Sequence, residues 1–152
     1  MTVSDLQIYF EGGKPFEIKN IRPLTGLAGL YLIYNSEIRI QYPFKKSRLI
    51  YIGMSEKKTN SIGKRLQGHL EGTSGNEGIL SYQKVNNLFF TYINFEMLKN
   101  RWSSRIESLE SFFILDFVKH YGVYPICNNK SGYDILTAAL NLNLKIDWEY
   151  FE

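Results

Sequence analysis

Two short apolar segments rich in aromatic residues constrain the fold of this chain more than any other feature of its sequence. Residues 29–34 read GLYLIY, and residues 49–53 read LIYIG. Short runs of β-branched and aromatic residues that are bounded by polar segments are typical of buried strands. Because strands close together in a sequence usually pair with each other, we expect an antiparallel pair, with the second strand ending at Gly53.

The rest of the chain predicts one further strand and several helices around this pair. Residues 88–95 (LFFTYINF) have the β-branched and aromatic density of a third strand. A short hairpin is expected between residues 6–10 and 16–18, and a projecting loop or hairpin arm over residues 35–47. Candidate caps, glycine stops and apolar spacing predict helices over four segments, which are residues 61–70, 78–85, 103–120 and 133–140.

The composition fits a single domain of the α+β class over residues 1–152. The chain is 44% hydrophobic and 15% aromatic, which excludes disorder for most of its length and leaves room for an apolar core. The order of the expected elements predicts a small, mostly antiparallel, three-stranded sheet flanked by helices, with short N- and C-terminal additions.

Cysteine usage and hydropathy limit where the protein is expected to work. Cys127 is the only cysteine, so an internal disulfide and a cysteine-rich zinc site are both excluded. We expect a reducing intracellular compartment, the cytoplasm, with Cys127 as a small buried hydrophobic residue. The sequence has no run of 18 apolar residues and no secretory signal at its N-terminus, so no membrane partner is expected.

The positive charge of the chain is concentrated in one segment. The formal net charge is only +3, but residues 45–65 alone carry +6 and the remainder carries −3. The basic residues of the segment are Lys45, Lys46, Arg48, Lys57, Lys58, Lys64 and Arg65. A basic stripe on an otherwise acidic domain predicts a surface that binds a polyanion.

Five residues from four segments have the chemistry of a phosphodiesterase site. They are Tyr31, Tyr51, Arg65, His69 and Glu110. Arg65 and His69 are four residues apart, so they share one face of the expected helix. A carboxylate can hold one Mg²⁺, and an arginine fork matches phosphate oxygens. A tyrosine hydroxyl, with an ordinary pKa of about 10, could serve as a base only if nearby cations or a histidine lower that pKa.

With these residues in this order, the sequence resembles the GIY-YIG endonuclease family. GLY at 29–31 is similar to the first signature triplet, with leucine for isoleucine, and YIG at 51–53 matches the second triplet. The family follows the second triplet with a helix that carries an arginine and, in many members, a histidine one turn later, as Arg65 and His69 do here. The resemblance covers about residues 27–129.

A glutamate and an asparagine complete the resemblance. Glu110 precedes a bulky apolar pair, as the family's glutamate does, although Glu107 lies one turn earlier and could project similarly. Asn128 follows a short extended segment, with Asn129 as the alternative, and its expected role is to hold the site together. The two triplets are separated by a nineteen-residue stretch from Leu32 to Ile50, similar to insertions in some restriction-enzyme members.

The resemblance implies a metal-dependent DNA endonuclease, a hydrolase with one Mg²⁺ or Mn²⁺ bound by Glu110. Tyr31 would act as the general base toward water, and His69 would accept or relay its proton or tune its pKa. Arg65 would neutralise the scissile phosphate, and Tyr51 would complete the phosphate or water network. Cleavage would leave a 5′-phosphate and a 3′-hydroxyl.

The expected partner is duplex or branched DNA. The residues expected to contact phosphates at the mouth of the site are Lys45, Lys46, Arg48, Lys57, Lys58 and Lys64. Tyr42 and Phe44 lie among these charges and could wedge between or stack on bases. Target recognition would come from the insertion, a homodimer or a partner chain. The alternative function is a catalytically silent or partner-dependent nucleic-acid-binding domain of a repair or defence complex.

Overall fold

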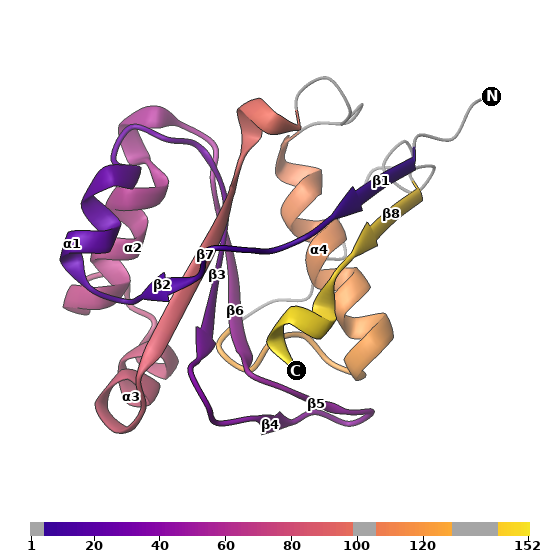
Figure 1. The fold of residues 1–152 in the computed structure, drawn as a ribbon. Helices are drawn as coiled ribbons and strands as arrows, with labels where there is room; N and C mark the ends of the chain where they lie inside the picture. Colours follow the sequence, from indigo (N-terminus) through magenta and orange to yellow (C-terminus); the bar gives the residue numbers. More distant parts are fainter. Residues whose placement is uncertain (1–4, 99–105, 129–142) are drawn as a thin grey trace.

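A four-stranded antiparallel sheet forms the centre of the computed structural model, which describes residues 5–98, 106–128 and 143–152 (Figure 1). The strand order is β2–β7–β3–β6. In that order the strands are Lys14–Pro15, Leu88–Asn94, Gly29–Asn35 and Leu49–Ser55. All seven residues of β3 are buried, as expected for a strand with neighbours on both sides and helices on both faces.

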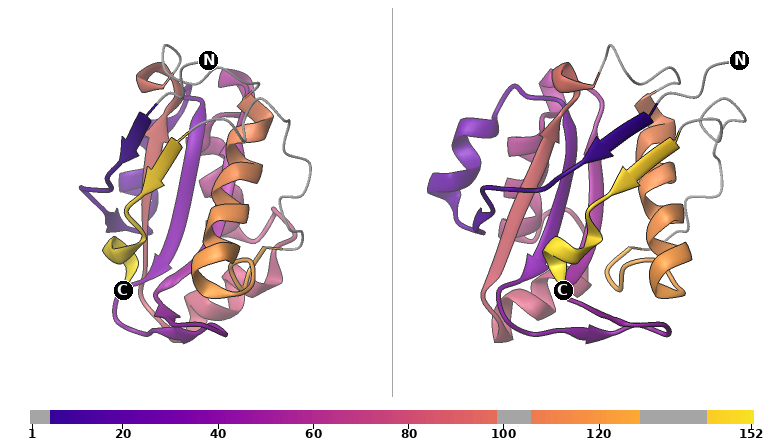
Figure 2. Two further views of the ribbon diagram at one scale, coloured as in Figure 1. Left: turned by 90° about the vertical axis from the view of Figure 1, so that its right-hand side faces the viewer. Right: turned by 45° about the vertical axis from the view of Figure 1, so that its right-hand side comes forward.

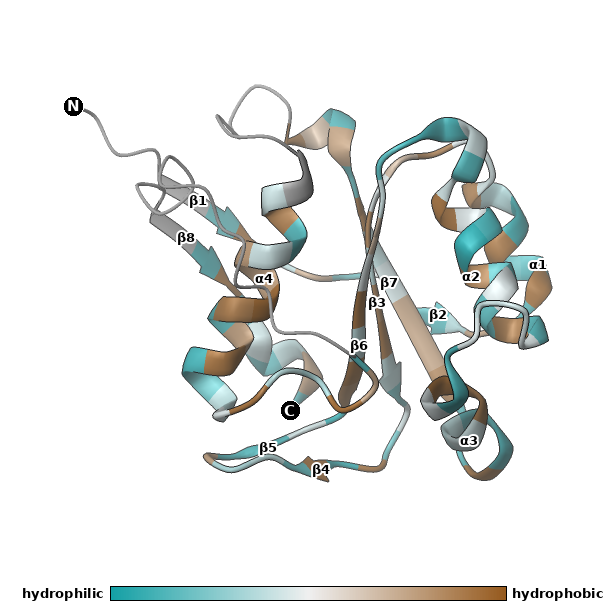
Figure 3. Cartoon of the chain, turned by 180° about the vertical axis from the view of Figure 1, so that it is seen from behind, coloured by the Kyte–Doolittle hydropathy of each residue, from teal (hydrophilic) through white to brown (hydrophobic). Residues whose placement is uncertain are grey.

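Helices cover the two faces of this sheet. One face carries α1, α2 and α3, and the other carries α4 (Figure 1). The helices are Ile18–Ile21, Ile62–Glu71, Glu77–Val85 and Ile106–Tyr121. Single 3₁₀ turns η1 to η4 are Arg22–Leu24, Lys58–Asn60, Phe95–Met97 and Trp148–Phe151. Apolar residues follow the strands and α4 (Figure 3), so the interior lies between the sheet and each helical layer.

The register of β3 decides which side chains meet across the sheet. Tyr31 lies opposite Gly53 of β6 and opposite Tyr92 of β7. Successive side chains of a strand point to opposite faces, so Leu30 and Leu32 join the apolar cluster on the α4 face. Tyr31 joins the cluster on the α2 face, which places its hydroxyl within reach of that helix.

Two short strand pairs extend the structure beyond the central sheet. β1 (Asp5–Ile8) pairs in parallel with β8 (Asn143–Ile146), which brings the first and last strands of the chain side by side (Figure 2). β4 (Ile40–Gln41) pairs with β5 (Lys46–Ser47) as a small hairpin, here called the arm. The arm leads directly into β6 and lies at the lower end of the sheet in Figure 1.

The α+β class and the three main strands are confirmed, but the sheet has four strands rather than three. β2 is only two residues long and pairs with β7, so it is too short to show a periodic pattern in the sequence. β6 also continues through Gly53 to Ser55, because the edge of β3 remains available for pairing there.

The expected hairpin between residues 6–10 and 16–18 is wrong. β1 pairs with β8 instead, a contact between distant parts of the chain that local sequence patterns cannot reveal. The helices expected over residues 61–70 and 78–85 are confirmed as α2 and α3, and most of the helix expected over residues 103–120 as α4. The start of that helix and residues 133–140 lie outside the described residues.

In the part of the chain that the structure describes, the helices are all too short or too polar to cross a membrane.

Candidate active site

The candidate site lies at the outer edge of β6, where α2 reaches from one face of the sheet and α4 from the other. Its centre is Tyr31, whose ring lies over Gly53 of the neighbouring strand. A Cβ atom on Gly53 would lie 2.5 Å from the Tyr31 hydroxyl oxygen. The glycine of the YIG triplet is therefore required by a close approach of the tyrosine ring, since a larger residue would displace it.

Helix α2 supplies two residues that contact the Tyr31 hydroxyl. Ser61 caps the helix by accepting a hydrogen bond from the Lys64 N–H at 3.3 Å, so the predicted start of the helix is confirmed. One turn apart on its inner face, Arg65 Nε donates to the Tyr31 hydroxyl at 3.4 Å, and His69 Nε2 lies 3.0 Å from the same oxygen. The structure thus brings together three residues that are up to 38 positions apart in the sequence.

Burial holds Tyr31 and His69 in their neutral forms. The pKa of His69 is lowered from 6.5 to about 4, first by burial and then by the charge of Arg65. Burial also raises the pKa of Tyr31, although Arg65 and its hydrogen-bonding neighbour Tyr51 oppose this effect. At neutral pH, Tyr31 therefore keeps its proton and His69 retains an unprotonated ring nitrogen.

The two signature tyrosines differ in their access to solvent. Tyr31 has no exposed surface, whereas Tyr51 is partly exposed and borders a hollow beside α2. The ring centroids of Tyr31 and Tyr51 are 6.0 Å apart, and those of Tyr51 and His69 are 5.1 Å apart. Tyr51 therefore stands between the buried Tyr31–His69 pair and the open side of the site.

Two hollows meet at Arg65. The larger, of about 590 Å³, runs along α2 and the turn after it, and we call it the helix hollow. The smaller, of about 390 Å³, reaches from the end of β6 to α4 and contains Glu110, and we call it the carboxylate hollow. Arg65 and Asn60 border both of them. A phosphodiester placed with its phosphate against Arg65 would therefore have space on either side for the two groups that it joins.

Glu110 reaches the site from α4, on the opposite face of the sheet from α2. It is half-buried, and its charge acts on both Tyr31 and Tyr51. The backbone of Glu107 lies in the same helix, but its side chain is outside the described part of the structure. The side chain that demonstrably lines the carboxylate hollow is that of Glu110.

The described residues contain no group of three or more histidine, cysteine, aspartate or glutamate side chains that could form an all-protein metal cage. Mg²⁺ does not need one, because it is commonly bound by one or two carboxylates together with substrate phosphate oxygens and water. Glu110, in a polar hollow that also borders Arg65, fits a cation of this kind that is completed by the substrate.

Asn128 binds the backbone of β6. Its Oδ1 accepts from the Ile52 N–H at 3.0 Å, and its Nδ2 donates to the Ile52 carbonyl at 2.9 Å. The neighbouring Cys127 N–H donates to the Ile50 carbonyl at 2.8 Å. The amide thus occupies the place of a further strand at the outer edge of β6, next to Tyr51. Asn129 lies outside the described residues.

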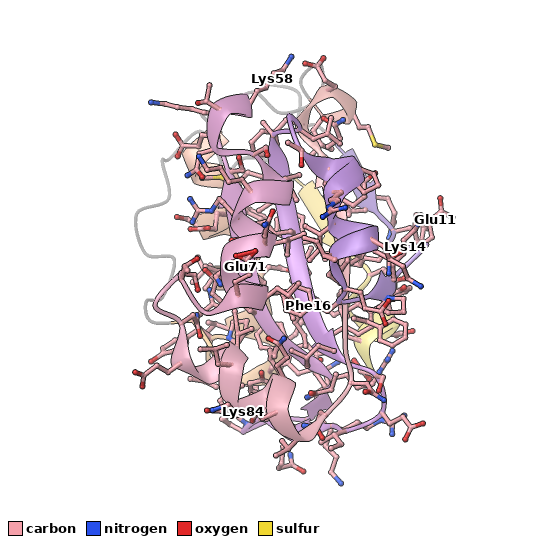
Figure 4. All side chains as sticks on the ribbon, turned by 90° about the vertical axis from the view of Figure 1, so that its left-hand side faces the viewer. Glu11, Lys14, Phe16, Lys58, Glu71 and Lys84 are labelled. Carbon is pink, nitrogen blue, oxygen red and sulfur yellow. The ribbon has the colours of Figure 1, made fainter. Side chains whose placement is uncertain are left out.

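The basic segment divides into two groups at opposite ends of β6. Lys57 and Lys64 border the two hollows, and Figure 4 shows Lys58 at the same upper end of the molecule. Lys45 and Lys46 belong to the arm at the lower end, about 20 Å away for a strand of seven residues. The expectation that all the basic residues surround one mouth is therefore wrong, because β6 separates them.

Arg48 is held within the protein. Its guanidinium donates to the Tyr150 carbonyl at 2.7 Å and to the Ser36 carbonyl at 3.1 Å, and it lies 5.2 Å from the centre of the Tyr34 ring. Lys45 is paired with Glu152 at 3.4 Å. These contacts explain the positions of both cations without a nucleic acid.

The two aromatic residues of the arm also differ. Tyr42 is buried, and its hydroxyl donates to the Leu49 carbonyl at 2.7 Å and accepts from the Ile126 N–H at 3.0 Å. The idea that Tyr42 wedges between bases is therefore wrong. Phe44 is 70% exposed and stays a candidate for a stacking contact.

Sequence reasoning missed Ser74, in the turn between α2 and α3. Its Oγ lies 2.7 Å from Nδ1 of His69, on the side of the ring away from Tyr31. Serine in a turn is common, so no local signal distinguishes this one.

Comparisons with protein-family models, curated proteins and solved structures found no match.

Proposed function

We propose that this chain is a metal-dependent endonuclease that hydrolyses phosphodiester bonds in DNA. The observation that carries the proposal is the arrangement around the Tyr31 hydroxyl. Arg65 and His69 contact that oxygen directly, while Glu110 approaches the same centre from the opposite face of the sheet. An anion-binding cation, a neutral proton acceptor and a carboxylate thus meet within one site.

Arg65 is assigned to the scissile phosphate. It is half-buried and borders both hollows, so a phosphate beside it leaves the nucleic-acid chain free to continue in both directions. A guanidinium presents parallel N–H groups that match phosphate oxygens, and it stays charged at any pH of interest. It would also offset the negative charge that develops on the phosphate as the reaction proceeds.

Glu110 is assigned to a single Mg²⁺ or Mn²⁺. When bound, such an ion polarises a phosphate oxygen and stabilises the leaving oxygen. Glu110 would supply one carboxylate ligand, and its position in the carboxylate hollow directs that ligand toward a phosphate held by Arg65.

The proton of the attacking water is assigned a path that ends on His69. Tyr51 borders the helix hollow and Tyr31 is enclosed behind it. Burial raises the pKa of both tyrosines, so the water would give its proton to Tyr51 Oη only as Tyr51 passes its own proton on. Tyr51 in turn gives its proton to Tyr31, and Tyr31 gives its own to Nε2 of His69, 3.0 Å away. Tyr31 is then the buried relay of this path rather than the group that touches water.

Hydrolysis would make one bond to phosphorus and break another. The water oxygen forms a bond to phosphorus, the bond from phosphorus to the 3′-oxygen breaks, and the 3′-oxygen takes a proton from solvent. The products are a 5′-phosphate, a 3′-hydroxyl and a protonated His69. The low pKa of His69, about 4, favours prompt return of that proton to solvent.

Supercoiled plasmid cleavage tests the proposal. The wild-type protein should nick or linearise the plasmid only when Mg²⁺ or Mn²⁺ is added, and Tyr31→Phe and Glu110→Gln should abolish this activity. Tyr92→Phe is the matched control for Tyr31→Phe, because Tyr92 is the partner of Tyr31 on β7 and lies partly exposed outside the site.

Two results would overturn the assignment. Cleavage that persists in both Tyr31→Phe and Glu110→Gln would mean that the activity comes from a contaminant or another site. No cleavage of duplex, branched or single-stranded DNA by the wild-type protein, together with DNA binding, would favour the catalytically silent or partner-dependent alternative.

A further inference from the structure

Ser74 makes a contact that the proposed chemistry has not used so far. Its Oγ lies 2.7 Å from Nδ1 of His69 and accepts a hydrogen bond from the Asn76 N–H at 3.2 Å. Ser74 also borders the helix hollow, close to where substrate would lie. The two ring nitrogens of His69 therefore face two different hydroxyl groups, one from Tyr31 and one from Ser74.

The donors around Tyr31 favour the form of His69 that carries its proton on Nδ1. Arg65 can only donate, so the Tyr31 oxygen accepts a hydrogen bond from it. The Tyr51 hydroxyl is a second donor, because its hydrogen bond lowers the pKa of Tyr31. If Nε2 of His69 also donated, the buried Tyr31 O–H would have to turn to the Tyr51 oxygen, and Tyr51 could then no longer donate to Tyr31. The Tyr31 O–H therefore donates to Nε2, and the ring proton of neutral His69 is on Nδ1.

The proton on Nδ1 then needs an acceptor, and Ser74 Oγ occupies that position. A serine oxygen has two lone pairs, so it can accept from both Nδ1–H and the Asn76 N–H while its own O–H points elsewhere. In a neutral histidine, the hydrogen bond made by one ring nitrogen sets the state of the other.

The turn that carries Ser74 is held firmly in place. Gly72 ends α2 in the left-handed conformation, with φ of 85°, and the N–H groups of Thr73 and Ser74 donate to the Gly68 carbonyl at 2.9 and 3.2 Å. Asn76 then begins α3 and donates from Nδ2 to the Cys127 carbonyl at 2.9 Å. The Ser74 oxygen is thus anchored to α2 on one side and to the loop beside β6 on the other.

We propose that Ser74 is a positioning residue that fixes His69 as the tautomer protonated on Nδ1, so that Nε2 faces Tyr31 as a proton acceptor. Its effect on cleavage depends on the proposed nuclease function, but its effect on the histidine ring does not. Without Ser74, either nitrogen of the ring can carry the proton, and the form protonated on Nε2 cannot accept from Tyr31.

Nitrogen NMR of the histidine ring tests this assignment without any DNA or metal. The chain has only two histidines, so a His120→Asn background leaves His69 as the one ring to be observed. At neutral pH, His69 should be protonated on Nδ1 and bare on Nε2, and Ser74→Thr, which keeps a hydroxyl, should preserve this state. Ser74→Ala should shift a substantial fraction of the ring to the other tautomer.

Two further variants separate the contact from general damage. Ser81→Ala removes an exposed serine from α3 and should leave the His69 spectrum unchanged. Ser74→Asp can accept from both N–H groups, so it should keep the proton on Nδ1 even if Ser74→Ala fails to fold. A wild-type ring protonated on Nε2, or a tautomer unaffected by loss of the hydroxyl, would overturn the proposal.

Cleavage rates supply the second readout. Loss of a residue that orients a reacting group typically lowers activity by about 10- to 100-fold, so Ser74→Ala should lower kcat by this amount, with KM nearly unchanged and Ser74→Thr largely active. Normal cleavage by Ser74→Ala would overturn the role of Ser74. If the wild-type protein shows the expected tautomer but never cleaves DNA, the proposed function fails while the assignment of the histidine ring stands.

Discussion

The two ends of strand β6 carry similar basic sequences but have different surroundings. At the arm end, Arg48 and Lys45 contact backbone carbonyls, a carboxylate and aromatic rings within the protein. At the site end, Lys57 and Lys64 are exposed beside two polar hollows. A basic segment is therefore not one functional unit, because the neighbours that the fold provides determine whether a cation stabilises the protein or faces a ligand.

The two arginines of the basic segment each lie beside a tyrosine of β3 but should differ in their roles. Arg65→Lys should lower the cleavage rate by about 10² to 10³-fold, since an ammonium cannot reproduce the guanidinium fork at a phosphate. Arg48→Lys should instead lower the free energy of unfolding by about 1 to 2 kcal/mol, because partly buried carbonyls lose their donors, and should leave cleavage by the folded protein nearly unchanged. Urea unfolding and plasmid cleavage of both variants measure the two effects.

A reversal of the effects on cleavage and on stability would contradict these roles for Arg65 and Arg48. If Arg48→Lys abolished cleavage while the protein stayed folded, the arm would belong to the substrate surface after all. If Arg65→Lys changed only stability, Arg65 would be a structural residue.

Acid should destabilise the folded protein through His69 at the site end. His69 has a pKa of 6.5 when unfolded and about 4 when folded, so the unfolded chain binds more protons between these values. The stabilising effect of keeping His69 neutral is complete above about pH 6.5 and is lost as the pH falls toward 4, which amounts to about 3 kcal/mol. Urea unfolding from pH 7.5 to 4 should show this loss.

The matched variants for this prediction are His69→Gln and His120→Asn. His69→Gln removes the buried imidazole, so its stability should depend less on pH over this range, while His120→Asn removes an exposed histidine and should behave like the wild-type protein. The same slope in all three proteins would contradict the burial of a neutral His69.

The smallest expected effect concerns DNA affinity at the two ends. Each lysine that contacts a phosphate contributes about 0.9 to the slope of log affinity against log salt, so Lys57→Ala with Lys58→Ala should reduce this slope by about 2. Lys45→Ala with Lys46→Ala removes the same number of charges from the arm and should change the slope by less than about 1. Fluorescence anisotropy at several salt concentrations measures both slopes. Equal changes in slope for the two double variants would mean that the arm also contacts DNA.

The main elements of the fold could be predicted because their signals are local. GLYLIY and LFFTYINF become strands, and Ser61 and Gly72 delimit α2 as expected. The fourth strand and the parallel pairing of β1 with β8 could not be predicted, since two residues carry no period and a pairing across 138 positions leaves no mark in either segment.

The sequence alone shows which residue types are available to the site, and it places Arg65 and His69 on one helical face because helical geometry is local. Three features depend on the folded structure: Tyr31 is enclosed while Tyr51 is accessible, Ser74 lies behind His69, and β6 holds the two basic groups apart. The physical reason is that burial, hydrogen-bond partners and distances between charges depend on packing between segments that are far apart in the chain.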